Sequence, residues 1–255
     1  MHCGEICHRL DDELDTDAYA DLDVSANGLQ VGPEAMDVDH VAFAVDAAVE
    51  TIARASEAGA GLLVTHHGLF WDGIERLTGK HYRRIAPLVD DDIALYTAHL
   101  PLDGHPSLGN AAGVADALAL SNRSPFGAMG DQWIGQRGTA ADAFTAPELR
   151  ETLAAELDTG GQDVRLLDYG PTEIRDVAIV TGSGVDWLDE ALEVGADALV
   201  TGEGKQFAYH EAREAGIHVV LAGHYATETF GVRALQELVD GWGLETTFID
   251  HPTGL

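Results

Sequence analysis

The sequence is poor in cysteine and has no long apolar run. Its 255 residues contain 2 cysteines, Cys3 and Cys7, which are too few for a disulfide scaffold. No apolar stretch approaches the roughly 20 residues that span a bilayer. The first residues, MHCGEICHRLDDEL, lack the apolar region of a secretory signal. We therefore expect a soluble protein of the cytoplasm.

Basic side chains are also scarce. There are 14 Lys and Arg against 44 Asp and Glu, for a formal net charge of −30, and only Lys80 and Lys205 are lysines. So acidic a surface repels nucleic-acid phosphates and anionic membranes, so we expect neither as a partner. The acids are spread over the whole chain, which is typical of cytoplasmic proteins of salt-loving organisms. The alternative is an acidic face that docks a basic partner.

A fourteen-residue stretch occurs twice. ASEAGAGLLVTHHG (55–68) and ALEVGADALVTGEG (191–204) share eight identical positions without a gap, at an offset of 136. Upstream, VAFAV (41–45) aligns with VAIVT (177–181). Each copy reads as a strand, a helix that ends at a glycine, and a second apolar strand. Such βαβ units predict parallel sheets with helices on their faces.

The repeat continues after a change in length. IALYTAHLPLD (93–103) and HVVLAGHYATE (218–228) each read as an apolar strand that ends in histidine, with a carboxylate four residues later. The sequence therefore predicts an α/β fold of two related, βαβ-containing lobes, residues 1–122 and 173–255. Residues 123–172 are expected to form a connector with its own structure. In it we predict strands at 132–138 and 163–170 and, from the capping box Thr145–Glu148 with Pro147, a helix at 146–157.

Histidines and carboxylates follow the predicted strands. His66 and His67 end the strand LLVT, at the edge where open α/β sheets bind ligands. His224 and Glu228 are spaced to share one face of a helix start, and Asp103 takes the matching position in the first half. Imidazole and carboxylate groups are ligands for divalent metals. Taken singly, each could instead be a polar loop residue or a helix cap.

The duplication makes convergence of these side chains the stronger interpretation. His66, His67, Asp103, His224 and Glu228 suffice for two metals if a carboxylate bridges them. We expect zinc, iron, manganese or nickel. His99 is either a sixth ligand or a partner of a ligand.

Two further polar clusters are weaker candidates. Glu203 occupies the position of the histidine pair in the second half. Three roles are open for it: a general base, a hydrogen-bond acceptor for a metal ligand, or a solvated loop acid. His2, Cys3, Cys7 and His8 could bind a metal, but a first helical turn bearing free thiols fits them better.

Several spaced blocks resemble one protein family over essentially the whole chain. VTHHGLFW, AHLPLD, TGEG, GHYATE and DVSANGLQVG (23–32) are similar to the dinuclear-metal-centre, toroidal-hexamer family, commonly called GTP cyclohydrolase 1 type 2 homologues. The resemblance implies two metals held by His66, His67, Asp103, His224 and Glu228, and a ring of six identical subunits. The family usually has an aromatic residue after the aspartate of the last block, where this chain has Val24.

Three functions from different classes follow. The first is a metal-dependent hydrolase, possessing a metal site positive enough to attract a small anionic metabolite and to activate water. The second is a protein that binds or delivers a metal or metallocofactor without turnover. A regulatory interaction protein is a third interpretation, from a eukaryotic relative.

Overall fold

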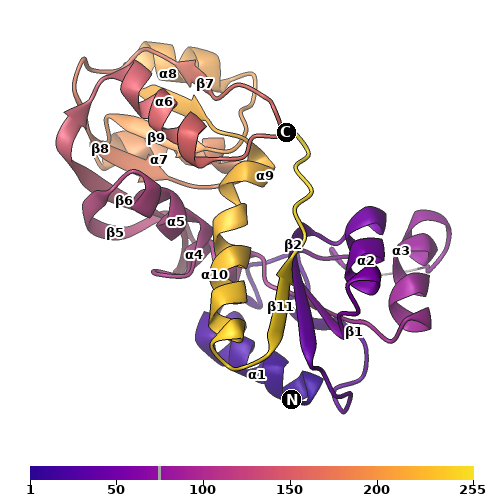
Figure 1. Ribbon diagram of the computed structural model, residues 1–255. Helices are drawn as coiled ribbons and strands as arrows, with labels where there is room; N and C mark the ends of the chain where they lie inside the picture. Colours follow the sequence, from indigo (N-terminus) through magenta and orange to yellow (C-terminus); the bar gives the residue numbers. More distant parts are fainter. Residues whose placement is uncertain (74–75) are drawn as a thin grey trace. The chain divides into compact units, whose positions relative to one another are not determined.

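The computed structural model describes residues 1–73 and 76–255. Over these residues the chain forms two compact units, each with its own sheet. The first unit comprises Met1–Leu102 and Gly231–His251, and the second comprises Asp103–Phe230 and Pro252–Leu255. Helices accompany both sheets, so the predicted α/β fold class is confirmed (Figure 1).

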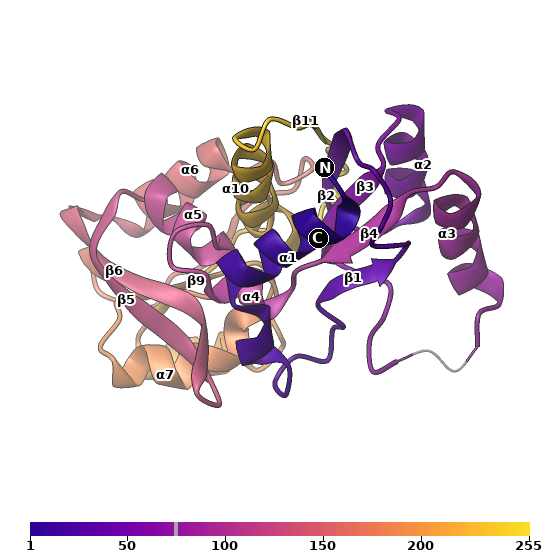
Figure 2. The ribbon, with the colours of Figure 1, turned by 90° about the horizontal axis from the view of Figure 1, so that it is seen from below.

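The sheet of the first unit has the strand order β1-β4-β3-β2-β11. Strand β1 is antiparallel to β4, and the other neighbours are parallel. Figures 1 and 2 show α2 and α3 on one face of this sheet and α1 and α10 on the other. The strands are β1 (Gly28–Val31), β2 (His40–Asp46), β3 (Leu62–His67), β4 (Ala94–Thr97) and β11 (Glu245–Phe248), and the helices are α1 (Cys3–Leu14), α2 (Val49–Glu57), α3 (Gly79–Asp90) and α10 (Thr229–Asp240), with a 3₁₀ turn at Thr16–Tyr19.

The central strands of this unit are apolar because helices cover both of their faces. Every residue of β2 between its two ends is buried. Leu63 of β3 and Leu95 of β4 belong to one core cluster with Ile52 of α2 and Leu88 of α3. Cys3 and Cys7 lie in α1 as buried free thiols, so the predicted helix with free thiols is confirmed there.

The sheet of the second unit has the order β5-β6-β8-β9-β10-β7. Its centre, β8-β9-β10, is parallel, whereas β5, β6 and β7 pair antiparallel with their neighbours. Figure 2 shows α5 and α6 on one side of β6 and β9, with α7 on the other. The strands are β5 (Leu120–Met129), β6 (Gln132–Phe144), β7 (Arg165–Leu167), β8 (Ile174–Ile179), β9 (Ala198–Thr201) and β10 (His218–Leu221), and the helices are α5 (Asn110–Ala117), α6 (Ala146–Glu156), α7 (Leu188–Glu193), α8 (Ala208–Ala215) and α9 (His224–Thr227), with a 3₁₀ turn at Gly184–Trp187; α4 (Leu100–Gly104) begins in the first unit and ends in the second.

The sequence repeat is a structural repeat. Val41 pairs with Leu62 in the first unit and Val177 pairs with Ala198 in the second, so both residues of the pair shift by the same 136 positions. Gly59 and Gly195, which follow the two helices, have φ values of 72° and 74°. This left-handed conformation suits glycine, which explains its place at both helix ends.

The unit boundaries differ from the predicted segments. Strand β11 pairs with β2, so residues 231–251 return to the first unit rather than extending the second lobe. The expected connector is not separate either, because β5 and β6 join the sheet of the second unit through β8. Its predicted helix is α6, and the capping box is present, with Glu148 N donating to Thr145 Oγ1. No helix in the described part of the chain is long and apolar enough to cross a membrane.

Candidate metal centre

The histidine pair ends strand β3, and a tight turn follows it. A Cβ on Gly68 would lie 2.4 Å from Thr97 Oγ1 and 2.5 Å from the amide of Gln30. Gln30 Oε1 accepts a hydrogen bond from Leu69 N at 2.8 Å. The close approach of Gln30 and Thr97 therefore requires glycine directly after His67.

Three histidines of the first unit each bind an acceptor through Nδ1. His66 Nδ1 lies 2.9 Å from the carbonyl oxygen of Ala98. His67 Nδ1 is 2.9 Å from Asp46 Oδ1, and His99 Nδ1 is 2.9 Å from Asp23 Oδ1. Carbonyl and carboxylate oxygens accept hydrogen bonds, so Nδ1 of each ring is the donor. A neutral imidazole protonated at Nδ1 carries its free lone pair on Nε2. This arrangement is typical of histidines that bind metals.

These three rings lie together. One ring nitrogen from each of His66, His67 and His99 is within 4.8 Å of the other two. Ring centroids are 4.6 Å apart for His66 and His67 and 5.2 Å apart for His66 and His99. His66 is fully buried, whereas the other two side chains are about one-fifth exposed. The donor chemistry fits a divalent transition metal, for which imidazole is a preferred ligand.

A buried carboxylate holds His99 in this cluster. The Asp23 side chain is 0% exposed and accepts hydrogen bonds from Ser25 N, Asn27 Nδ2 and Leu100 N at 2.8–3.0 Å. Burial raises the pKa of Asp23, but the hydrogen bond and charge of His99, with the Asn27 and Ser25 bonds, outweigh it and lower that pKa. Asn27 Oδ1 also accepts from His99 N at 2.7 Å. Asp23 therefore holds the ring of His99, and Asn27 holds its backbone.

In the second unit, a histidine lies between two carboxylates. His224 Nε2 is 3.2 Å from Glu228 Oε1, and Nδ1 is 3.4 Å from Glu203 Oε1. Burial lowers the pKa of His224, but the hydrogen bond and charge of Glu228, and then those of Glu203, raise it to about 9. Glu203 accepts a hydrogen bond from Ser183 Oγ, which lowers its own pKa. The predicted pairing of His224 with Glu228 at one helix start is confirmed. Glu203 contacts the opposite, Nδ1 side of the imidazole.

Glycine makes room for this group. A Cβ on Gly182 would lie 2.3 Å from Glu228 Oε1 and 3.2 Å from His224 Nε2, and its φ is +57°. Asp103 touches the preceding residue: Thr181 Oγ1 donates to Asp103 Oδ1 at 3.1 Å, and Asn110 Nδ2 donates to the same oxygen at 2.8 Å. Asp103 and Glu228 therefore contact successive residues of one loop in the second unit.

Both groups occupy the carboxyl ends of neighbouring parallel strands, as predicted for the histidine pair. Strands β2, β3 and β4 end at or just before Asp46, His67 and His99. The sequence repeat predicts that His99 and His224 occupy equivalent positions, but the structure shifts this alignment by one residue. Ala98 N donates to Thr65 O, and Ala222 N donates to Thr201 O, so the backbone aligns Ala98 with Ala222. His99 therefore corresponds to Gly223.

The cysteine and histidine residues near the N-terminus are not drawn into one group. Cys3 and Cys7 are buried, whereas the side chains of His2 and His8 are 64% and 75% exposed. His2 instead lies 3.0 Å from Asp37, and His8 lies 3.5 Å from Asp12. This geometry agrees with the interpretation of a helical turn bearing free thiols.

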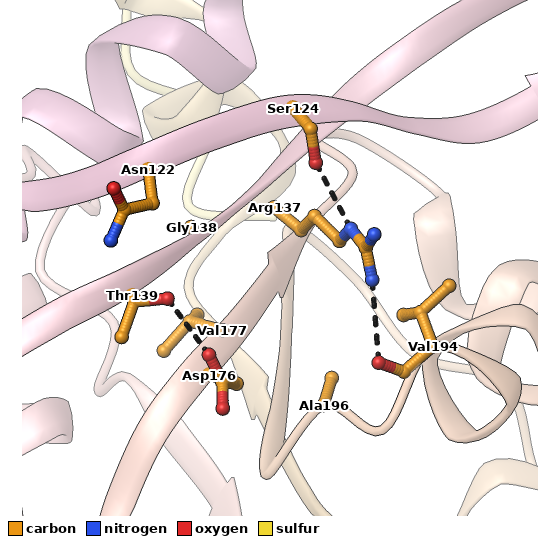
Figure 3. A pocket seen from close by; sticks show the side chains of 9 residues that line it. All are labelled: Asn122, Ser124, Arg137, Gly138, Thr139, Asp176, Val177, Val194 and Ala196. Carbon is orange, nitrogen blue, oxygen red and sulfur yellow. Dashed lines mark hydrogen bonds between the residues drawn. The ribbon is translucent and has the colours of Figure 1, made fainter.

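A hollow of about 260 Å³ lies elsewhere in the second unit (Figure 3). Arg137 crosses it, donating through Nε to Ser124 Oγ at 3.0 Å and through Nη1 to Val194 O at 3.3 Å. Thr139 Oγ1 donates to Asp176 Oδ1 at 2.9 Å. These polar groups of the wall are hydrogen-bonded to one another, so the strand-end groups are the better candidates for chemistry.

The sequence interpretation missed the partners of the histidines. Asp46 and Asp23 were not assigned a role, although Asp46 directly follows the apolar stretch VAFAV and Asp23 opens the block DVSANGLQVG. An aspartate at the end of a strand next to a histidine-bearing strand is a usable signal for such a partner. Trp71, whose ring centroid is 6.1 Å from that of His67, was also missed.

The fold and these groups define a class: α/β proteins of two related units, with histidines and carboxylates at the carboxyl ends of parallel strands. The chain belongs to the Duf34/NIF3 (NGG1p interacting factor 3) family, whose model matches residues 1–254. It is similar to a Halobacterium salinarum protein named GTP cyclohydrolase 1 type 2 homolog, with 59% identity over 255 residues and 100% of both chains covered. A Pyrococcus abyssi protein of the same name is 41% identical over 257 residues, again with 100% of both chains covered.

Solved structures of similar proteins share the whole fold. Protein TTHA1606 from Thermus thermophilus matches with a TM-score of 0.89 and 36% identity, covering 100% of each chain. Reduced HcgD from Methanocaldococcus jannaschii matches with a TM-score of 0.86 and 26% identity, covering 98% of each chain. The predicted family resemblance is thus confirmed.

Proposed function

We propose that this protein binds two divalent metal ions and hydrolyses a small anionic metabolite. The ligands in this proposal are His66, His67, Asp103, His224 and Glu228, with His99 as a further ligand. The observation that carries it is the histidine cluster of the first unit, in which every Nδ1 is held by an acceptor and the ligand nitrogens lie within 4.8 Å of one another. A divalent ion bound there would lower the pKa of a coordinated water and so supply a nucleophile.

The chain's own residues account for holding and orienting the ligands. Asp46 and Asp23 orient His67 and His99. In the second unit, Glu203 lies against the Nδ1 side of His224, so it favours the ring orientation that directs Nε2 to the Glu228 side. Asp103 and Glu228 supply negative charge that would balance bound cations. The name GTP cyclohydrolase 1 type 2 homolog, borne by relatives, supports hydrolytic chemistry on an anionic substrate.

Metal loading and turnover test this proposal together. The full chain is purified without chelator, its zinc, iron, manganese and nickel contents are measured, and each loaded form is assayed against a panel of phosphorylated metabolites. We expect two ions per chain and slow, metal-dependent hydrolysis of at least one compound. Saturation at one ion would contradict the dinuclear centre. Full loading with no turnover, together with metal transfer to an apo-acceptor, would favour delivery of a metal or metallocofactor.

Assembly and location are parts of the same proposal. Family resemblance supports a ring of six identical subunits acting in the cytoplasm. Light scattering of the purified protein tests the ring, because six copies of a 27.1 kDa chain differ clearly in mass from one or two. A stable monomer under molar salt would contradict it.

A further inference from the structure

A partly exposed tryptophan borders the histidine cluster of the first unit. The Trp71 residue is 39% exposed. Its ring centroid is 5.0 Å from that of His99, in an edge-on arrangement with an interplanar angle of 79°, and 6.1 Å from that of His67. Part of a large aromatic residue is therefore open beside two of the proposed ligands.

The backbone and the indole nitrogen both hold this tryptophan in place. Trp71 Nε1 donates to Gly68 O at 3.2 Å, within the turn that follows His67. Trp71 also pairs with Ser25 in an isolated antiparallel bridge. On either side of it, Ala26 N donates to Phe70 O and Asp72 N donates to Val24 O, at 3.1 and 3.0 Å. A ring anchored through Nε1 on a backbone held at these points loses little conformational freedom when a ligand packs on it.

The neighbouring residue on the paired segment is apolar and open as well. Val24 is 56% exposed, and its carbonyl accepts the hydrogen bond from Asp72 N just described. Apolar surface beside a cluster of polar ligands is the usual composition of a small-molecule site, in which apolar side chains contact the body of the ligand and a few polar groups orient it. The flat face of an indole favours another flat ring, which it contacts in an offset stack.

We propose that Trp71 is a specificity residue that stacks a planar heteroaromatic ring of the substrate beside the metal held by His66, His67 and His99. This inference rests on the proposed function and narrows its substrate class to anionic metabolites that carry such a ring. Affinity for the anionic group comes from the metals, and affinity for the ring comes from Trp71. The two contributions are therefore separable by removing one part of the ligand.

Calorimetric titration of the zinc-loaded full chain separates them. The probes are guanosine 5′-monophosphate and ribose 5-phosphate, which lacks the planar ring. We expect Trp71→Ala to weaken binding of the nucleotide by about 5- to 150-fold, the usual loss when a stacking partner of a base becomes alanine. Binding of ribose 5-phosphate should stay within about twofold of the wild type, because it makes no stacking contact. Trp71→Phe should retain part of the nucleotide affinity.

A matched control is available in the second unit. Trp133, in β6, is 42% exposed, and Trp133→Ala removes an indole of similar exposure that does not belong to this cluster. We expect this variant to bind both probes like the wild type. Zinc content and molar mass are measured for every variant, so that a lost metal or a changed assembly is recognised before affinities are compared.

The outcomes separate the proposed metal-dependent function from the stacking role of Trp71. Wild-type protein that takes up none of zinc, iron, manganese and nickel would overturn the proposed function, and titration of the metal-free protein with the nucleotide would then test stacking alone. Full zinc loading with equal nucleotide affinity in wild type and Trp71→Ala would overturn the inference. So would a wild type that does not prefer the nucleotide over ribose 5-phosphate. A change in molar mass on Trp71→Ala, with nucleotide affinity unchanged, would instead assign the exposed ring to subunit contact.

Discussion

Asp46 and His67 face each other at the ends of neighbouring parallel strands. The register of β2 and β3 pairs the two residues, and Asp46 Oδ1 lies 2.9 Å from His67 Nδ1. The carboxylate thus directs Nε2 of the ring toward the other two histidines. The partner of a metal-binding histidine is part of the site, since it fixes the orientation and basicity of the ligand.

The first prediction concerns this pair. We expect Asp46→Asn to weaken metal binding by about 10- to 100-fold, the usual effect of removing such a partner. Competition titration with a chromophoric chelator measures the affinity. Asp37→Asn is the control, because Asp37 pairs with the exposed His2 of the same unit. Equal affinities for Asp46→Asn and the wild type would show that the pair has no role in metal binding.

The second prediction separates backbone strain from crowding of the ligands. Gly182 and Gly195 have φ values of 57° and 74°, so an alanine costs about 1–2 kcal/mol at either position. Of the two, only an added Cβ on Gly182 would meet a proposed ligand, at 2.3 Å from Glu228 Oε1, whereas no described atom lies within 4 Å of a Cβ on Gly195. We therefore expect Gly182→Ala to lose both stability and metal affinity, and Gly195→Ala to lose stability alone.

Urea unfolding and metal titration of the two alanine variants measure these effects. Metal titration is made under conditions in which both variants are folded. An unchanged metal affinity in Gly182→Ala would mean that Glu228 can move away without loss, and it would count against Glu228 as a ligand. A lost affinity in Gly195→Ala would mean that backbone strain alone accounts for both results.

The sequence predicted those parts of the fold that depend on local pattern. Apolar strands, glycines after helices and the capping box of Thr145 and Glu148 are readable because each is set by a few adjacent residues. The position of His66 and His67 was predictable for the same reason, because they are polar residues at the end of an apolar strand. The repeat then predicted the parallel pairing of β2 with β3 and of β8 with β9, which the structure confirms.

Pairing between segments far apart in the chain could not be predicted from the sequence. Strand β11 joins β2 about 200 positions away in the chain, and no local signal specifies that partner. The same limit hid Asp23, because its bond to His99 joins residues 76 positions apart. The one-residue shift between the two halves depends on strand register, which backbone hydrogen bonds reveal and side-chain types do not.

The third prediction follows from the capping box of α6. Thr145 N and Thr145 Oγ1 both donate to Glu148 Oε2 at 2.8 Å, which lowers the pKa of Glu148 below its ordinary value. A carboxyl whose pKa is lowered by folding stabilises the fold above its unfolded pKa, and this contribution is lost as the pH falls through the lowered pKa. Glu148→Gln should therefore be less stable than the wild type near neutral pH.

This difference should shrink toward zero in acid, below the lowered pKa of Glu148. Urea unfolding of both proteins at several pH values measures it, because the other acidic groups are common to the two and cancel in the comparison. Glu156→Gln, at the far end of the same helix, is the control, and we expect no loss of stability near neutrality. A Glu148→Gln difference that does not change with pH would contradict the argument.

The last prediction concerns salt. With a formal net charge of −30, folding brings like charges together, and a ring of six copies would multiply the repulsion. Molar salt shortens the screening length to about 3 Å, whereas at 10 mM it is about 30 Å. We expect dilution from molar to millimolar KCl to dissociate the assembly. If the loss is about 3 kcal/mol, the melting temperature falls by about 6–12 °C at this chain length.

Light scattering and thermal unfolding across a KCl series measure both effects. Sucrose at matched osmolality is the control, because it favours compact states without screening charge and so should not restore the assembly. The acids that matter here are dispersed, so no single substitution should remove the salt requirement. A ring of six that persists at about 10 mM KCl would instead mean that its interfaces bury enough apolar surface to outweigh the unscreened repulsion.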